Sequence, residues 1–174
     1  MLKIRYYGDP VLRAKALPIA EITPEILQLA QEMIEAMIAY NGVGLAAPQI
    51  GKLLRIYVYR DERVKSDGEY ELGDPEVVIN PVLSKPSKES ETMLEGCISL
   101  PGLRVNVSRP KKVHIRYQNL KGEFVEKALE DFCARVNMHE NDHLNGVLHI
   151  DRVSPKERKA LEVPLQKMKK KYSS

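Results

Sequence analysis

The chain has 174 residues, of which 43% are apolar and 29% are charged, and its net charge is +3. This length fits a single domain, residues 1–174, that is large enough to bury its own core. The composition is that of a water-soluble globular protein. No apolar run approaches the length of a membrane span, which excludes a membrane-embedded chain. The net charge is too small to indicate nucleic-acid binding by the chain as a whole.

The N-terminal residues, 1–7, contain neither the apolar block of a secretion signal nor an Arg/Ser-rich transit pattern. The two cysteines, Cys97 and Cys133, are therefore expected to stay free thiols in a reducing compartment. These features together predict a cytoplasmic protein.

The first half of the chain predicts one helix followed by strands. Thr23-Pro24 has the pattern of an N-cap with proline at the first helical position. Apolar residues then recur at helical spacing until Asn41-Gly42 ends the helix. After a glycine-rich loop, strand-like segments follow at 54–59, 77–83, 103–107, 113–117 and 123–129. Residues 61–75 are predicted to form a polar surface loop.

Two more helices are predicted in the last third of the chain. The first runs from Asp131 to Leu144 and ends before Gly146, with Phe132, Val136, His139 and His143 on one face. The second begins at Ser154-Pro155. Pro164 should kink or break it, because proline lacks a backbone donor and clashes with the preceding turn.

The segment His139-Glu140-Asn141-Asp142-His143 carries the strongest chemical pattern of the chain. Histidines four residues apart lie one helical turn apart on one face, so both imidazoles can bind one metal ion. Glu140 then lies near the ion, where a general base is needed. The alternative is a solvent-exposed helix that happens to carry two histidines.

A catalytic metal centre of this type has three protein ligands and an open position, so a third ligand is needed. Cys97 is the candidate, although a small buried thiol is the alternative for a cysteine in such a protein. Cys133 lies about 240° from His139 around the helix and is predicted to pack in the core.

The chain resembles the peptide deformylases along nearly its whole length. Three motifs carry the resemblance, in the family's order: Gly42-Val43-Gly44-Leu45-Ala46-Ala47-Pro48-Gln49, Glu95-Gly96-Cys97-Ile98-Ser99, and His139-Glu140-Asn141-Asp142-His143. The resemblance implies an α+β fold with antiparallel β-sheets wrapped around a central metal-binding helix, an N-terminal helix and a C-terminal helix. It also implies a ferrous ion held by Cys97, His139 and His143, although Zn²⁺, Ni²⁺ and Co²⁺ suit such ligands too.

The implied reaction removes the N-formyl group from the initiator methionine of newly made polypeptides and releases formate. Glu140 would take a proton from water and pass it to the departing amine. The side-chain amide of Gln49 and the backbone N–H of Ile98 would stabilise the oxygen that gains negative charge. Gly44, without a Cβ, would let the substrate backbone approach and pair in strand fashion.

The family pattern places Val43, Phe132, Val136 and His139 around the methionine side chain. Phe132 and Val136 would also suit any buried helix face. Arg104 matches a position beside the substrate cleft, although a solvated strand arginine is the alternative. The chain departs from the family pattern at Asn137, Met138 and Asn141, which puts the orientation of the neighbouring metal ligands in question.

Two other functions share parts of this pattern. A metalloprotease would use the same helix with a third ligand from a later helix, for which Glu162 is the candidate, but it leaves Cys97 and Gln49 without roles. A structural metal site would need a fourth protein ligand, and the sequence offers none beyond Glu140.

The C-terminal segment, residues 154–174, is a basic helix or tail. It carries seven basic and two acidic residues, a local charge of +5. A solvated helix face is one explanation. The other is a contact with ribosomal RNA near the exit of the nascent chain, which bacterial relatives make through a C-terminal helix. The protein is expected to be a monomer.

Overall fold

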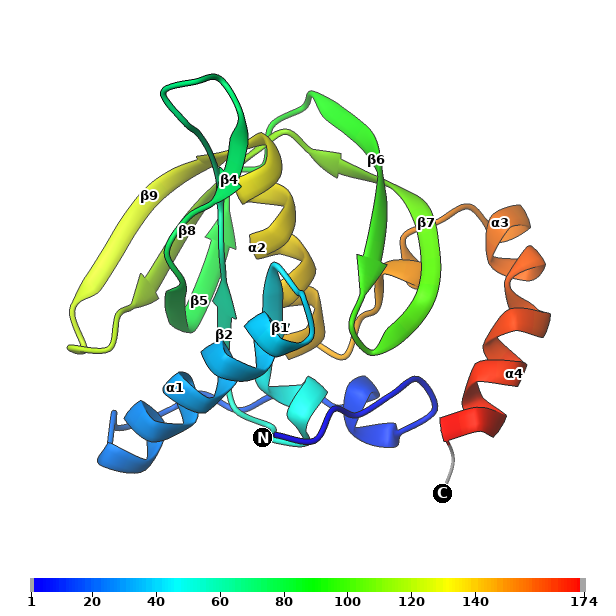
Figure 1. Ribbon diagram of the computed structural model, residues 1–174, viewed down its shortest axis with the longest axis horizontal. Helices are drawn as coiled ribbons and strands as arrows, with labels where there is room; N and C mark the ends of the chain where they lie inside the picture. Colours follow the sequence, from blue (N-terminus) through cyan, green and yellow to red (C-terminus); the bar gives the residue numbers. More distant parts are fainter. Residues whose placement is uncertain (1, 173–174) are drawn as a thin grey trace.

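The computed structural model describes residues 2–172 (Figure 1). Its helices are α1 (Pro24–Ala39), α2 (Asp131–Leu144), α3 (Pro155–Ala160) and α4 (Glu162–Tyr172), with short 3-10 turns η1 (Pro10–Arg13), η2 (Ala47–Ile50) and η3 (His149–Asp151). Its strands are β1 (Gly44–Ala46), β2 (Ile56–Tyr59), β3 (Glu62–Val64), β4 (Tyr70–Leu72), β5 (Glu76–Ser84), β6 (Ser90–Cys97), β7 (Leu100–Pro110), β8 (Lys112–Gln118) and β9 (Phe124–Glu130).

Helix α2 lies between two antiparallel sheets (Figure 1). On one side is a five-stranded sheet in the order β1-β2-β5-β8-β9, and on the other is the long hairpin β6–β7. A third, two-stranded sheet is formed by β3 and β4. The predicted α+β fold, with antiparallel sheets around a central helix, is confirmed.

The alternation of side chains along β2 explains why the five-stranded sheet is covered on both faces. Ile56 and Val58 point to the core shared with α1, whereas Tyr57 and Tyr59 point to the core shared with α2. All four side chains are at most 1% exposed. The helices α1 and α2 thus cover opposite faces of the five-stranded sheet, and this packing fixes the position of α2.

The structure corrects several sequence-based boundaries. Residues 61–75 are exposed, as predicted, but they contain the hairpin β3–β4 rather than a plain loop. Strands β1 and β6 were not predicted, and β7 is longer than the predicted segment 103–107. Strand β6 is polar and mostly exposed, so it lacks the alternating apolar pattern from which strands are recognised.

The C-terminal helix is divided, as Pro164 predicted. The break between α3 and α4 falls at Leu161, because a proline at 164 clashes with the carbonyl of the residue four positions earlier. Ser154 caps α3, since its Oγ accepts a hydrogen bond from the Glu157 backbone N–H (3.2 Å). Within residues 2–172, no helix combines the length and the apolar character needed to cross a bilayer.

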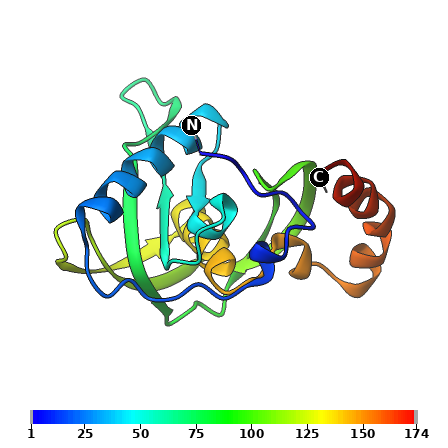
Figure 2. The same ribbon diagram turned by 90° about the horizontal axis from the view of Figure 1, so that it is seen from below.

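Helix α4 packs against the rest of the protein. Leu165 is 2% exposed and joins a core cluster with Leu12 and Leu100. The aliphatic stem of Lys169 covers Gly8, where an added Cβ would lie only 2.7 Å from Cγ of the lysine. Figure 2 shows the N-terminal segment passing beside α4. Within the basic segment, α4 is therefore docked against the rest of the protein up to Tyr172.

Candidate active site

Helix α2 presents two histidines and a carboxylate at the centre of the molecule. His139 and His143 are one turn apart, and their ring centroids are separated by 5.1 Å. Cys97 reaches them from the end of β6, where an irregularity in the pairing with β7 changes the register between Gly96 and Cys97. Its Sγ lies 3.3 Å from Nε2 of His143. One ligand atom from each of the three residues lies within 4.8 Å of the other two.

This set of donors fits a divalent transition metal. A thiol sulfur and two imidazole nitrogens converge from two elements, and soft or borderline ligands of this kind suit iron, zinc, nickel or cobalt. The Nδ1 atom of His139 is 2.9 Å from Oε1 of Glu95, which leaves Nε2 for the metal. Burial lowers the pKa of His143 well below its usual value, which favours the neutral ring that can bind a metal ion.

Glu140 is the carboxylate beside this centre. It is 4% exposed, and burial raises its pKa to about 7. Its Oε2 atom has no hydrogen-bond partner among the described residues. A Cβ added at Gly44 would overlap with Oε1 of Glu140, so the glycine makes room for this side chain. Gly44 is therefore needed to accommodate Glu140, in addition to the close approach of the substrate backbone that the sequence predicts at this glycine.

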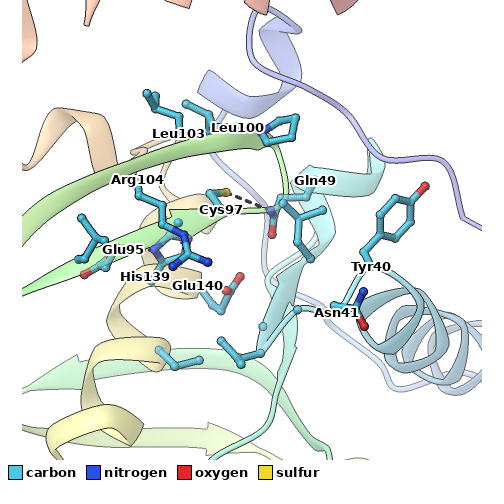
Figure 3. Close-up of a pocket in the computed structure, with 18 of the residues that line it drawn as sticks. Tyr40, Asn41, Gln49, Glu95, Cys97, Leu100, Leu103, Arg104, His139 and Glu140 are labelled. Atoms are coloured by element: carbon cyan, nitrogen blue, oxygen red, sulfur yellow. Dashed lines mark hydrogen bonds and ion pairs between the residues drawn. The ribbon is translucent and has the colours of Figure 1, made fainter. Parts of the chain in front are cut away.

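The Gln49 side chain is held in one orientation beside Cys97. Its Oε1 accepts a hydrogen bond from the backbone N–H of Ala46 (2.8 Å). Its amide Nε2 therefore points toward the site, where it lies 3.2 Å from Oγ of Ser99 and 3.5 Å from Sγ of Cys97 (Figure 3). A donor aimed at this place is suited to stabilise an oxygen that gains negative charge.

A cavity of about 520 Å³ opens in front of these groups. The residues predicted to bind substrate all line it: Val43, Gly44, Phe132 and Val136. Ile98, whose backbone N–H is predicted to stabilise the oxygen, lines it as well. Arg104 and His139 line it as well, on the side away from Tyr40 and Asn41 (Figure 3). His143 does not line the cavity, since it is buried behind it with 1% exposure. The volume is within the range of pockets that bind small ligands.

A buried network of charges below the centre was not predicted. Glu95 accepts two hydrogen bonds from Arg109 (2.7 and 3.0 Å) and one from Arg135 (2.6 Å), besides its contact with His139. Arg109 also donates to Asp142 (3.0 Å). Burial alone would raise the pKa of Glu95, but the hydrogen bonds from His139 and Arg109 outweigh it and lower that pKa. Glu95 is two residues before Cys97 in one strand, so the two side chains lie on the same face. This spacing was the sequence signal that could have placed Glu95 near the metal ligands.

The unusual residues of α2 lie away from the metal ligands. Asn137 is fully buried, and its Oδ1 accepts a hydrogen bond from the Tyr57 hydroxyl (2.7 Å). Met138 packs in the core shared by α2 and the sheet, and Cys133 is partly buried against the same core. Both cysteines are free. Asn141 is outside the Cys97/His139/His143 group, and its Oδ1 is buried with no hydrogen-bond partner in residues 2–172.

The sequence-based alternatives can be compared with this geometry. Glu162, the third ligand of the metalloprotease alternative, is exposed at the start of α4 and is not part of the described metal-binding group. The ligand cluster found within residues 2–172 contains three residues rather than the four of a structural site. One oxygen of the buried Glu140 carboxylate has no hydrogen-bond partner within residues 2–172, and it lies next to this cluster and an accessible cavity, which is the arrangement expected of a hydrolase.

Comparisons with known proteins specify the family. The polypeptide deformylase family model matches residues 1–159, and the chain belongs to this family. Peptide deformylase from Thermotoga petrophila is 45% identical over 166 residues, which cover 95% of this chain and 94% of that protein. The chain is accordingly a deformylase, as the three motifs predicted.

Solved structures agree with this assignment. A crystal structure of peptide deformylase from Thermotoga maritima has a TM-score of 0.80 and 44% identity, and the match covers 89% of this chain and 99% of that one. A plant peptide deformylase has a TM-score of 0.89 at 35% identity and covers 98% of this chain and 90% of that one.

Proposed function

We propose that the chain removes the N-formyl group from the initiator methionine of new polypeptides in the cavity in front of Cys97, His139 and Glu140. The observation that carries the proposal is the convergence of three ligand atoms within 4.8 Å of one another beside a buried carboxylate oxygen that has no hydrogen-bond partner in the described part of the chain. Water is the second substrate, and formate and a free amine are the products.

Cys97, His139 and His143 are the proposed ligands of one divalent ion. When bound, that ion supplies Lewis acidity, which polarises a carbonyl and lowers the pKa of water. Fe²⁺ is the proposed ion on the basis of the family resemblance. Glu95 keeps the ring of His139 oriented through the 2.9 Å contact with its Nδ1 atom.

Glu140 is the proposed proton carrier. Its carboxylate is buried beside the three proposed ligands, where it would accept a proton from water and return it later. Burial and the absence of a hydrogen-bond partner on Oε2 leave this oxygen available for a water molecule. The proton taken from water would then be delivered to the amine as the C–N bond breaks.

The amide Nε2 of Gln49 and the backbone N–H of Ile98 are proposed to donate hydrogen bonds to the formyl oxygen as it becomes negative. Because the Ala46 N–H holds Oε1 of Gln49, the amide cannot present its oxygen instead of its nitrogen without losing that bond. The methionine side chain would then occupy the part of the cavity lined by Val43, Phe132 and Val136, beside the backbone of Gly44.

Replacing Glu140 tests the proposal. Glu140→Gln should keep its metal but deformylate formyl-Met-Ala-Ser about 10²–10⁴-fold more slowly, because an amide cannot accept the proton. Glu126→Gln, at an exposed site on β9, is the matched control. Turnover above about a tenth of the wild-type value would remove Glu140 from this role. Loss of the metal would instead identify it as a ligand.

The place of action follows from the substrate. We propose that the protein works in the cytoplasm, where formylated chains emerge from ribosomes, and as a monomer, since one chain provides all the proposed groups. Exposed lysines of α3 and α4 are the proposed ribosome contact: Lys156, Lys159, Lys167, Lys170 and Lys171. Their positive charge would gain affinity by releasing counterions from RNA phosphates.

A charge-reversal variant tests this contact better than truncation, because α4 buries Leu165 and brings Tyr172 to the cavity. The double variant Lys167→Glu/Lys170→Glu should bind ribosomes with lower affinity, and its affinity should change less with salt concentration. Its turnover on formyl-Met-Ala-Ser should be unchanged. Lys121→Glu, at an exposed turn, is the control. Equal ribosome binding by the wild type and the double variant would refute the contact.

A further inference from the structure

Three tyrosines from distant parts of the chain meet at one end of the cavity. Tyr6 belongs to the N-terminal segment, Tyr40 is the C-cap of α1, and Tyr172 is the last residue of α4. All three line the same cavity as Cys97 and Glu140. The rings of Tyr6 and Tyr172 are stacked, with centroids 4.1 Å apart and an angle of 24° between their planes.

The three side chains form one group, here called the tyrosine cluster. Burial raises the pKa of Tyr6, and the neighbouring hydroxyls of Tyr40 and then Tyr172 raise it further. Tyr40 remains 37% exposed, although it contacts the other two through Tyr6. An aromatic surface of this kind, left partly open toward a substrate cavity, is available for another apolar group.

The cluster has a fixed position because α4 is anchored before it reaches Tyr172. Leu165 is buried in the core cluster of Leu12 and Leu100, and the stem of Lys169 covers Gly8. The Tyr172 ring is thereby held over Tyr6. Its placement depends on tertiary packing of the C-terminal helix, and not on the local sequence around it.

The path of an extended substrate leads toward the tyrosine cluster. Strand β1, which begins at Gly44, is at an edge of the five-stranded sheet, so its outer side can accept a further strand. Gly44 adjoins Glu140, and the chain leads from there back through Asn41 to Tyr40. Figure 3 shows Tyr40 and Asn41 across the cavity from His139 and Arg104. A peptide that pairs antiparallel to β1 runs opposite to this strand and advances about 3.4 Å per residue, so its residues after the methionine would approach Tyr40.

We propose that Tyr6, Tyr40 and Tyr172 form an accessory subsite for a large apolar or aromatic side chain in one of the two residues that follow the formylated methionine. The subsite rests on the proposed function, because it assumes that the methionine is bound beside Glu140. The apolar side chains of Pro101 and Leu103 also line the cavity, which suits an apolar occupant. The cluster would act on substrate selection and not on the chemical step.

Three peptides and four variants test the subsite. The peptides are formyl-Met-Ala-Ser, formyl-Met-Phe-Ser and formyl-Met-Ala-Phe, and kcat/KM is measured for each. The wild type should prefer one of the phenylalanine peptides over formyl-Met-Ala-Ser by roughly 3- to 10-fold, the factor expected for one aromatic contact. Tyr172→Ala and Tyr40→Ala should each reduce this preference to below about twofold, because the rate on the phenylalanine peptide falls more than the rate on formyl-Met-Ala-Ser. Tyr172→Phe should retain it, since the ring remains.

Tyr70→Ala removes a tyrosine that is 72% exposed on β4 and should leave the preference unchanged. Equal kcat/KM values for the three peptides in the wild type would overturn the subsite, as would a preference that survives both alanine variants. In either case the proposed function would stand. If no peptide were deformylated, the proposed function and the subsite would both fail.

Discussion

Replacing Glu95 by glutamine should damage both folding and metal binding, because this carboxylate connects the metal ligand His139 to two buried arginines. The Glu95 side chain is 6% exposed, and those of Arg109 and Arg135 are 4% and 8% exposed. Glutamine has the same shape but no charge, and its NH₂ group would face N–H donors. Removing one partner from a buried ion pair typically costs about 3–5 kcal/mol.

Two features of the structure set the expected magnitude. Arg109 keeps its second partner, Asp142, at 3.0 Å, so the loss of unfolding free energy should be near the lower limit, about 3 kcal/mol. Because the amide keeps only one oxygen, the Nδ1 proton of His139 would compete with the two arginines for this single acceptor. Loss of such a partner behind a metal-binding histidine typically weakens metal affinity about 10- to 100-fold.

Urea unfolding and a metal titration measure the two effects, and Glu91→Gln is the matched control. Glu91 is exposed on the same strand, so neither quantity should change there. The reasoning would be refuted if Glu95→Gln had the same unfolding free energy and the same metal affinity as the control variant. It would mean that the arginines and His139 are adequately paired without this carboxylate.

The pH dependence of stability gives an independent check. The pKa of Glu95 is lowered in the folded protein, so its contribution is fully present above the unfolded value of about 4.3. It is lost as pH falls through the lower, folded pKa. The difference in stability between the wild type and Glu95→Gln should therefore be constant above about pH 5 and shrink below about pH 4.

Three further substitutions have distinct expected outcomes. Cys97→Ser should lower the metal content of the purified protein, because two imidazoles alone bind the ion weakly; full occupancy would remove Cys97 from the ligands. Gly44→Ala should reduce turnover at least about 100-fold with metal retained, since its Cβ would displace Glu140, and near-normal kcat would show that the carboxylate can move. Asn141→Leu should raise the unfolding free energy by about 1 kcal/mol, because it removes a buried oxygen without a partner. Its turnover should be unchanged, and a large fall in kcat in a folded variant would reveal a catalytic role for Asn141.

Local sequence was sufficient for the helix that carries the chemistry. The spacing of His139 and His143 places both on one face of any α-helix, and Gly146, whose φ is 71°, ends that helix through its own backbone freedom. Pro164 divided the C-terminal helix for an equally local reason. The three short motifs then identified the family, and with it the α+β fold.

Tertiary structure decided what depends on distant contacts. The polar strand β6 forms because it pairs with β7, and only that hairpin brings Cys97 to 3.3 Å from His143. The charges of Glu95 and Arg109 look like solvated residues in sequence, yet they are buried because each neutralises the other. The burial of Leu165 likewise turns a basic tail into a docked helix that carries Tyr172 to the cavity. Such pairings join residues far apart in the chain, so local pattern and propensity contain no record of them.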